Sequence, residues 1–178
     1  TVLSRGLGDV YKRQVLENGE YIVTWSSLGQ DGSDYGIYAQ RFSANGEKIH
    51  GEFQVNEYVD KNQAHSNIAA LPNGEFVITW ISKGQDGTEY SIFAQRFNER
   101  GEKIGLEFLV NSTKEDEQTL PEILALDNGQ FIIVWQSGTD IGSRAVFGQL
   151  FNSHGQKIGS EIEISATVDG DHSRPYLT

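Results

Sequence analysis

Short runs of β-branched and aromatic residues, separated by Gly and Asn, fill the chain from residue 15 onward. No stretch has the 3.6-residue spacing of apolar positions that an amphipathic helix requires. In the run at 76–80 (FVITW), Phe76, Ile78 and Trp80 lie on one side of a strand and the residues between them on the other. Both sides are largely apolar. The pattern therefore predicts a strand covered on both faces, unlike the alternating pattern of a sheet with one wet face.

The same pattern occurs three times at a period of 55 residues. Trp25, Trp80 and Trp135 keep this spacing, and so do three Asn-Gly pairs. The segment IYAQRF at 37–42 recurs as IFAQRF at 92–97, and as the looser VFGQLF at 146–151 after the loss of one residue. A period of this length is typical of an architecture in which each repeat is one supersecondary unit.

Each copy is predicted to form four strands. A short apolar strand ends in Leu, an Asn-Gly pair makes a tight turn, and the second strand ends in Trp. An acidic, Gly-rich loop leads to the third strand, and a second Gly-containing turn leads to the fourth. These elements predict an all-β fold: three four-stranded antiparallel blades that form an open β-propeller arc. A β-solenoid is the alternative, although its coils usually have only about 20–30 residues.

The repeat divides the chain into five parts. Residues 1–14 (TVLSRGLGDVYKRQ) match neither equivalent segment, so we expect a non-native leader, with a natural leader strand as the alternative. The three blade repeats and the first strand of a truncated fourth repeat are then expected at 15–70, 71–125, 126–173 and 174–178.

Three blades cannot close a ring, because propellers have about four to eight. We therefore expect the two terminal faces of the arc to expose apolar residues such as Ile22, Ile132 and Val134. Exposed apolar faces of this kind predict self-association in solution.

Charge and composition limit the classes of molecule that the chain is expected to bind. The net charge of −11 and the sequence pI near 4.7 argue against binding nucleic acid or anionic membrane surfaces, which need basic patches. No apolar run approaches the about 20 residues needed to cross a bilayer, so no membrane insertion is expected. The absence of cysteine excludes disulfides, Cys-based zinc sites and a cysteine nucleophile.

The string GQDGSDYGIYAQRF at 29–42, with the later GEKI and EFxVN motifs, resembles long tandem repeats of very large bacterial surface and secreted proteins of the RTX and adhesin type. The resemblance covers 15–178 and implies an extracellular location and a role in a repeat array, without implying a reaction. The strand ending in Trp also resembles a sialidase-type propeller blade, with lower specificity.

The loops between the second and third strands are the candidate metal sites. Asp31 and Asp34 in the first copy, and Asp86 and Glu89 in the second, place carboxylates among glycines, as a calcium site could use. The alternative is that these residues only form turns. The third copy keeps a single acid in this loop, Asp140.

Aromatic and amide side chains recur beside these loops and inside the strands. Tyr35 and Tyr90 could stack on a sugar ring, or could cap the edge of a blade core. The three repeated Trp residues are predicted to pack between blades. The three Gln residues of the IYAQRF-type strands have apolar neighbours, so each amide is predicted to hydrogen-bond to a loop or to the next blade (Gln40, Gln95 and Gln149).

No catalytic or cofactor-binding residues are predicted. Glycoside hydrolysis needs two carboxylates at a defined separation, and the repeated Glu residues occur at strand ends without a break in the repeat. We therefore predict a non-catalytic structural or adhesive module of a large extracellular bacterial protein, which could bind glycan or calcium through its loops. The alternative is a fragment of a sialidase-like propeller glycoside hydrolase.

Overall fold

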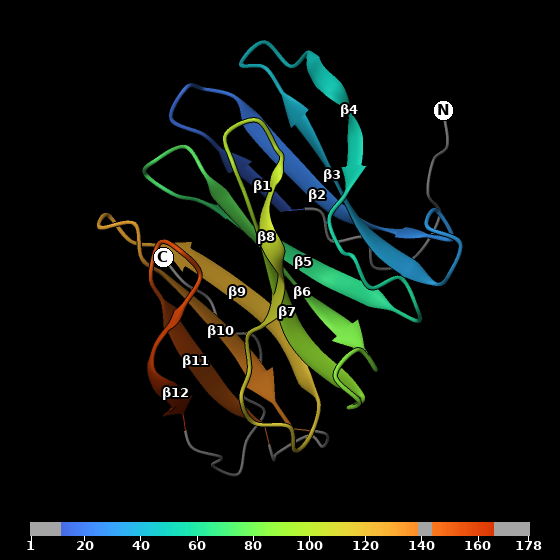
Figure 1. The fold of residues 1–178 in the computed structure, drawn as a ribbon, viewed down its shortest axis with the longest axis vertical. Helices are drawn as coiled ribbons and strands as arrows, with labels where there is room; N and C mark the ends of the chain where they lie inside the picture. Colours follow the sequence, from blue (N-terminus) through green and yellow to red (C-terminus); the bar gives the residue numbers. More distant parts are fainter. Residues whose placement is uncertain (1–11, 139–143, 166–178) are drawn as a thin grey trace.

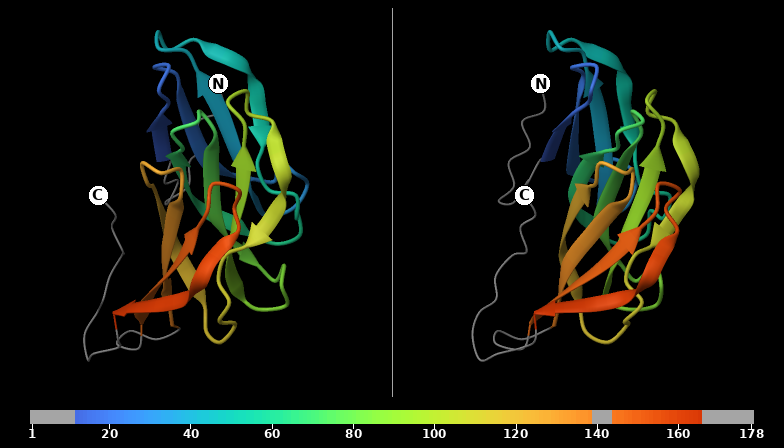
Figure 2. Two further views of the ribbon diagram at one scale, coloured as in Figure 1. Left: turned by 60° about the vertical axis from the view of Figure 1, so that its left-hand side comes forward. Right: turned by 90° about the vertical axis from the view of Figure 1, so that its left-hand side faces the viewer.

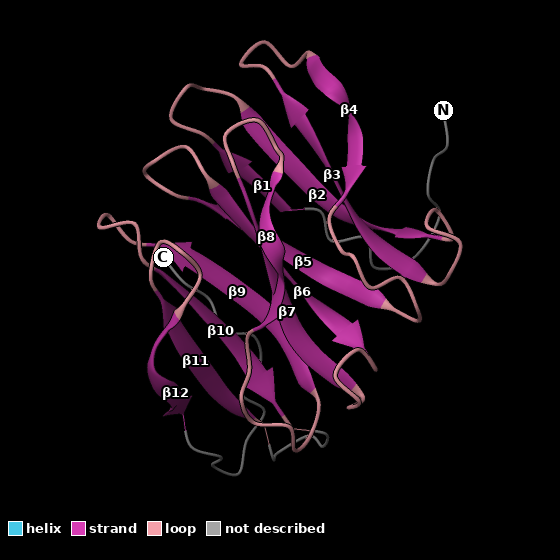
Figure 3. Ribbon diagram, viewed as in Figure 1, coloured by secondary structure: helices cyan, strands magenta, loops and turns pink. Residues whose placement is uncertain are grey.

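The computed structural model describes residues 12–138 and 144–165. These residues form twelve antiparallel strands in three four-stranded sheets, with no helix among them (Figure 3). Blade 1 contains β1 (Lys12–Val15), β2 (Tyr21–Leu28), β3 (Tyr35–Phe42) and β4 (Lys48–Gln54). Blade 2 contains β5 (Gln63–Ala70), β6 (Phe76–Lys83), β7 (Tyr90–Phe97) and β8 (Lys103–Leu109). Blade 3 contains β9 (Gln118–Ala125), β10 (Phe131–Ser137), β11 (Ala145–Phe151) and β12 (Lys157–Ser165).

The three blades stack face to face in chain order (Figure 1). The first strands, β1, β5 and β9, lie together along one edge of the stack, and the fourth strands lie along the opposite edge (Figure 2). The prediction of an all-β chain with three four-stranded antiparallel blades is confirmed. No described segment is a helix long and apolar enough to cross a membrane.

Each sheet begins one strand earlier than the predicted repeat unit. The boundaries expected at residues 70 and 125 fall between the first and second strands of blades 2 and 3. In blade 1, residues 12–14 of the predicted leader belong to β1, which pairs with β2. The remainder of that leader and the predicted fourth repeat at 174–178 lie outside the described residues.

Two hydrophobic cores lie between the blades, and they use the same repeat positions. The face that each blade turns to the next is here called its trailing face, and the face turned to the preceding blade its leading face. The trailing faces contribute Leu16, Ile22, Ile37, Ala39 and Val55 in blade 1, and Leu71, Val77, Ile92, Ala94 and Val110 in blade 2. The leading faces contribute Ile68, Phe76, Ile78, Trp80 and Phe97 in blade 2, and Ile123, Phe131, Ile133, Trp135 and Phe151 in blade 3.

The predicted inter-blade packing of the tryptophans is confirmed where a blade precedes. Trp80 and Trp135 are both 0% exposed in these cores. Trp25 is only half-buried, because it lies at the same position on the leading face of blade 1, which no described blade covers. The strand pattern therefore identified the packing face correctly.

The expectation that Ile22 and Val134 are exposed at the ends of the arc is wrong. Ile22 is 0% exposed because it lies on the trailing face of blade 1, against blade 2. Val134 is 2% exposed. Val134 and Ile164 both lie close to Gly148, since a Cβ built there would lie 2.9 Å from Ile164 Cδ1 and 3.3 Å from Val134 Cγ1. Ile132 is half-buried, as an open face allows.

The repeated Gln side chains donate hydrogen bonds at a bulge between the third and fourth strands of each blade. Gln40 Nε2 donates to the carbonyl oxygens of Arg41 at 2.8 Å and Ile49 at 3.2 Å. The register of β3 and β4 shifts at this point. Gln95 and Gln149 make the same bonds in their own blades. The prediction that these buried amides are hydrogen-bonded is confirmed, but their partners are carbonyl groups of the third and fourth strands of the same blade, not a loop or the next blade.

Polar contacts also tie one blade to the next. Arg41 Nη1 in blade 1 donates to the carbonyl oxygen of Arg100 in the β7–β8 turn at 2.7 Å, and its Nη2 pairs with Glu20 at 2.6 Å. Arg96 repeats the arrangement with the carbonyl of His154 in blade 3 at 2.9 Å. The third blade has Leu150 at this position.

In blades 2 and 3, a glutamate on the fourth strand binds the linker that follows the preceding blade. Glu107 on β8 accepts backbone N–H bonds from Glu57 at 2.7 Å and Tyr58 at 3.1 Å. Glu161 on β12 accepts the backbone N–H of Ser112 at 2.6 Å. These carboxylates satisfy backbone donors at the point where the chain passes from one blade to the next.

Candidate functional site

The first strands bring together three polar side chains from one repeat position. Lys12, Asn67 and Glu122 are separated by 55 residues each and lie on β1, β5 and β9. Glu122 Oε1 pairs with Lys12 Nζ at 3.0 Å, and Glu122 Oε2 accepts a hydrogen bond from Asn67 Nδ2. Side chains from blades 1, 2 and 3 therefore meet at the edge where the first strands converge. We call this group the inner-edge triad.

Local backbone geometry sets the position of two triad members. His65 and Leu120, each two residues before a triad residue, have positive φ angles of 54° and 52°. The register of β5 against β6 shifts between Ala64 and Asn67, and that of β10 against β9 shifts at the corresponding place. Bulges of this kind re-aim side chains and bend the strand. They precede Asn67 and Glu122 directly.

The triad combines an ammonium, an amide and a carboxylate. The side chains of Lys12 and Glu122 are 35% and 23% exposed, so solvent reaches both, whereas Asn67 is buried and its amide is bonded to Glu122 and to the backbone N–H of Ile68. Donors and acceptors placed side by side suit a ligand with many hydroxyl groups. The triad holds a single carboxylate, already paired with a cation, whereas hydrolysis of a glycosidic bond needs two carboxyl groups about 5–9.5 Å apart.

The predicted metal ligands fall into two separate turns. Asp31, in the β2–β3 loop, accepts the backbone N–H of Ser33 at 3.1 Å. Asp34 is exposed in the same loop. The two loops belong to different blades, and the described residues contain no group of three or more His, Asp or Glu placed to hold a metal ion. The predicted acid of blade 3, Asp140, lies outside the described residues.

The second loop uses its aspartate internally. Asp86 Oδ1 accepts bonds from the backbone N–H and the hydroxyl of Thr88 at 3.2 and 2.7 Å. Lys114 Nζ lies 3.6 Å from Asp86 Oδ2, and the Asp86 side chain is 8% exposed. Burial raises the pKa of Asp86, but the bonds from Thr88 and Ser91 and the charge of Lys114 outweigh it, so the pKa is lowered. The geometry is that of a side-chain-capped turn.

The remaining predicted residues lie beside these loops. Glu89 is exposed and pairs with Lys83 at 3.0 Å. Lys83 Nζ also lies 5.3 Å from the centroid of the Tyr90 ring, and Tyr90 packs against the core between blades 2 and 3. One face of this ring is therefore occupied by a cation and part of its surface by the core, which favours the core-edge role of Tyr90. Tyr35 is half-buried at the equivalent position.

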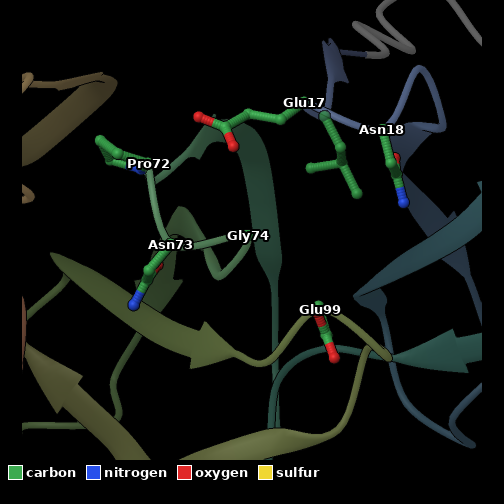
Figure 4. A pocket seen from close by; sticks show the side chains of 7 residues that line it. Glu17, Asn18, Pro72, Asn73, Gly74 and Glu99 are labelled. Atoms are coloured by element: carbon green, nitrogen blue, oxygen red, sulfur yellow. The ribbon is translucent and has the colours of Figure 1, made fainter.

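A small cavity lies at the opposite ends of the strands. It has a volume of about 270 Å³ and is lined by the β1–β2 turn, the β5–β6 turn and the β7–β8 turn (Figure 4). Glu17 and Glu99 line it from different blades, together with Asn18, Asn73 and Pro72. These residues are exposed turn residues. No sequence motif marked this cavity, because it arises from the packing of turns that are distant in the chain.

The sequence does not predict the inner-edge triad. Gln63 and Gln118, four residues before the triad position, are identical and fully or almost fully buried in blades 2 and 3. Asn67 and Glu122 differ within the same strands. Because β5 and β9 also differ at other positions, such as Ala64 and Thr119, comparison of the strands alone does not single out this one.

No protein-family model matches the chain, and no curated protein matches it. Solved structures of glycosidases share its fold. An endo-arabinase from Bacteroides thetaiotaomicron aligns with a TM-score of 0.54 and 17% identity over 88% of this chain and 61% of its own. An α-L-arabinofuranosidase from Lactobacillus brevis aligns with a TM-score of 0.54 and 9% identity over 85% of this chain and 54% of its own.

These alignments establish the fold class. The three packed four-stranded sheets match propeller glycosidases, so the predicted propeller arc is confirmed over the solenoid alternative. The chain spans less than two thirds of the length of either protein. At these identities the likeness concerns the fold alone.

Proposed function

We propose that the chain is a three-blade propeller sector that binds carbohydrate at its inner edge and carries no hydrolytic site of its own. The observation that carries the proposal is that three different polar side chains, Lys12, Asn67 and Glu122, meet from three blades at the edge where the first strands converge, whereas the cores between the blades use the same repeat positions. Residues that pack blades together repeat with the fold, whereas residues that bind an asymmetric ligand need not.

The chemistry of the triad supports a hydroxylated ligand. The Glu122 carboxylate is a partner of the kind that sugar hydroxyls hydrogen-bond in a binding site, and the buried Asn67 amide holds it in position. The net charge of −11 disfavours polyanionic ligands such as nucleic acid. Lys12 belongs to the stretch predicted to be a non-native leader, so the proposal rests on Asn67 and Glu122.

Hydrolysis within a larger propeller is the second candidate. Its support is the fold shared with an endo-arabinase and an α-L-arabinofuranosidase, which favours a carbohydrate role over an adhesive role without carbohydrate. Glu122 is one carboxylate, so the second group that hydrolysis requires would come from blades beyond these three. A location outside the cell and a place in a large repeat array remain predictions from the sequence.

A panel of neutral oligosaccharides, including arabino-oligosaccharides, separates these roles. Binding without release of reducing ends supports the first candidate. Release of reducing ends that stops in Glu122→Gln supports the second. Absence of both binding and release across neutral glycans contradicts the proposal that the inner edge takes carbohydrate.

A further inference from the structure

The leading face of blade 1 is one half of an interface that the structure already makes twice. Tyr21, Val23 and Trp25 hold the repeat positions of the Phe, Ile and Trp that fill the leading faces of blades 2 and 3. In blades 2 and 3 all three side chains are 0% exposed against the preceding blade. In blade 1 they are half-buried, so this face presents the same apolar chemistry without a neighbour among the described residues.

The trailing face of blade 3 is the other half. Val55 and Val110 are 0% exposed, whereas Ile164 at the equivalent position is 51% exposed. Ile162, 53% exposed, stands where blades 1 and 2 have a phenylalanine. Those phenylalanines each contact a phenylalanine of the next blade with ring centroids 5.6 Å apart (Phe53 with Phe97, and Phe108 with Phe151).

Among the described residues, blade 1 also lacks a hydrogen-bonded contact that blades 2 and 3 make with the linker before them. Glu107 and Glu161 are half-buried and hold backbone N–H groups of the preceding linker. Glu52, their equivalent in blade 1, is exposed and accepts a bond from Gln30 of its own blade at 2.6 Å. Glu107 makes this bond too, from Gln85, and holds the linker in addition. Within the described residues, no preceding linker donates to Glu52.

Blade 3 lacks the arginine contact that blades 1 and 2 make with the next blade, as a more apolar interface would allow. Arg41 and Arg96 each donate to a turn carbonyl of the next blade, and Leu150 replaces them in blade 3. A guanidinium buried there would need an acceptor, because an uncompensated buried charge is strongly unfavourable. With Leu150 the trailing face of blade 3 can be covered by an apolar surface alone.

We propose that a second copy of this chain docks head to tail on the first, with the trailing face of blade 3 against the leading face of blade 1. Two copies related by a two-fold axis make this contact twice and close a ring of six blades. Six lies within the range of about four to eight blades that propellers use. A contact between unlike faces gives a closed ring when the rotation per unit completes a circle. A second copy fits both open faces, because its blade 1 presents the kind of leading face that covers blades 1 and 2, and its blade 3 presents the kind of trailing face that covers blades 2 and 3.

Sedimentation equilibrium of the 178-residue chain between 1 and 100 µM tests the proposal. We expect a dimer of twice the 19.8 kDa chain mass. Ile164→Glu on the trailing face, or Val23→Glu on the leading face, is expected to raise the dimer dissociation constant about 100-fold or more, because each places a charge in both apolar contacts. Leu106→Glu, at a 77% exposed site on β8 away from both faces, is the matched control and should leave the constant unchanged.

Mixing the two variants tests the head-to-tail arrangement itself. Ile164→Glu keeps an intact leading face and Val23→Glu an intact trailing face, so an equimolar mixture should regain a dimer through one intact contact. A dimer formed by two like faces would persist in one variant alone and gain nothing on mixing. That result, or a chain that stays monomeric at 100 µM with a normal unfolding transition, overturns the proposal.

Discussion

Arg41, on β3 of blade 1, donates a hydrogen bond to the carbonyl oxygen of Arg100 in the turn of blade 2, over 2.7 Å. The same guanidinium pairs with Glu20 of its own blade. The side chain of Arg41, a residue that is 8% exposed, therefore joins β3 to Glu20 of its own blade and to the β7–β8 turn of the neighbouring blade. Arg96 repeats this geometry one blade later.

Replacement of Arg41 by Leu, the residue that blade 3 carries at this position, should lower the free energy of unfolding by about 1–3 kcal/mol, because the Arg100 carbonyl and Glu20 lose their partner. The measurement is urea denaturation followed by tryptophan fluorescence. Lys103→Leu removes an exposed pair with Glu57 at 3.7 Å and should cost less than about 1 kcal/mol. Equal costs for the two variants would show that the arginine contributes nothing across the blades.

Close approach at one glycine gives a second prediction. Gly101 has a φ of 83°, and a Cβ there would lie 3.2 Å from Arg41 Cδ. Gly46 has a φ of 84° in the equivalent turn of blade 1, where a Cβ would lie 3.6 Å from the Tyr21 hydroxyl. Gly101→Ala should therefore destabilise more than Gly46→Ala, by about 1 kcal/mol or more, since both share the backbone strain and only Gly101 meets the arginine. Thermal unfolding at low protein concentration compares the two, and a greater loss in Gly46→Ala would contradict the inter-blade contact.

The buried amides give a third prediction. Gln95 is 0% exposed and donates to the carbonyl oxygens of Arg96 and Ile104 at the bulge. Gln95→Leu keeps the size of the side chain but leaves these carbonyls without that donor, which should cost about 1–3 kcal/mol. Gln30→Leu, at an exposed loop position, is the control and should change the unfolding free energy by less than about 0.5 kcal/mol. Hydrogen exchange at the β7–β8 bulge should rise in Gln95→Leu and not in the control.

The sequence was sufficient for the parts of the fold that depend on periodicity. Apolar positions with a period of two on a strand, such as Phe76, Ile78 and Trp80, identify the faces that pack, and the 55-residue spacing repeats them. Which face meets the following blade does not follow from periodicity, because both sides of the strand are apolar. The prediction that Ile22 is exposed is therefore wrong, because Ile22 packs against blade 2.

The sites were harder to predict than the sheets. The contact between Lys12 and Glu122 joins residues 110 positions apart on the first and third blades, and it depends on how closely the first strands converge. The cavity between Glu17 and Glu99 likewise depends on turns of neighbouring blades. In contrast, the loop acids were visible as a motif, but their role depends on whether each carboxylate points outward or bonds its own backbone, as Asp86 does.

The lowered pKa of Asp86 predicts a pH dependence of stability. A carboxyl group whose pKa is lower in the folded than in the unfolded chain stabilises the fold above its unfolded pKa of about 3.9, and this contribution is lost as the pH falls through the folded pKa. The difference in unfolding free energy between the protein and Asp86→Asn should therefore shrink from pH 6 toward pH 3. Glu89→Gln, at an exposed site, is the control. A difference that grows with acidification would contradict the lowered pKa.

Adding calcium tests whether the β2–β3 and β6–β7 loops bind a metal ion. Because Asp31 and Asp86 each bond their own loop backbone, we expect millimolar calcium to shift the unfolding temperature no more than magnesium at equal ionic strength. A calcium-specific rise that disappears in Asp86→Asn would instead establish the metal site predicted from the acidic loops. Bound calcium at a hundredfold excess over its dissociation constant would add about 2.7 kcal/mol, which is well within detection.

Calorimetric titration of the neutral oligosaccharide that binds best tests the carbohydrate site most directly. Asn67→Ala should raise the dissociation constant about threefold to tenfold, because Glu122 loses the hydrogen bond from Asn67 that positions it, worth about 0.5–1.5 kcal/mol. Glu122→Gln, which keeps the shape of the side chain, should also weaken binding. Glu99→Gln, in the cavity between the β1–β2, β5–β6 and β7–β8 turns, should leave the dissociation constant unchanged. If Glu99→Gln abolishes binding while Asn67→Ala and Glu122→Gln, folded by their unfolding transitions, bind as the parent does, the inner edge is not the carbohydrate site.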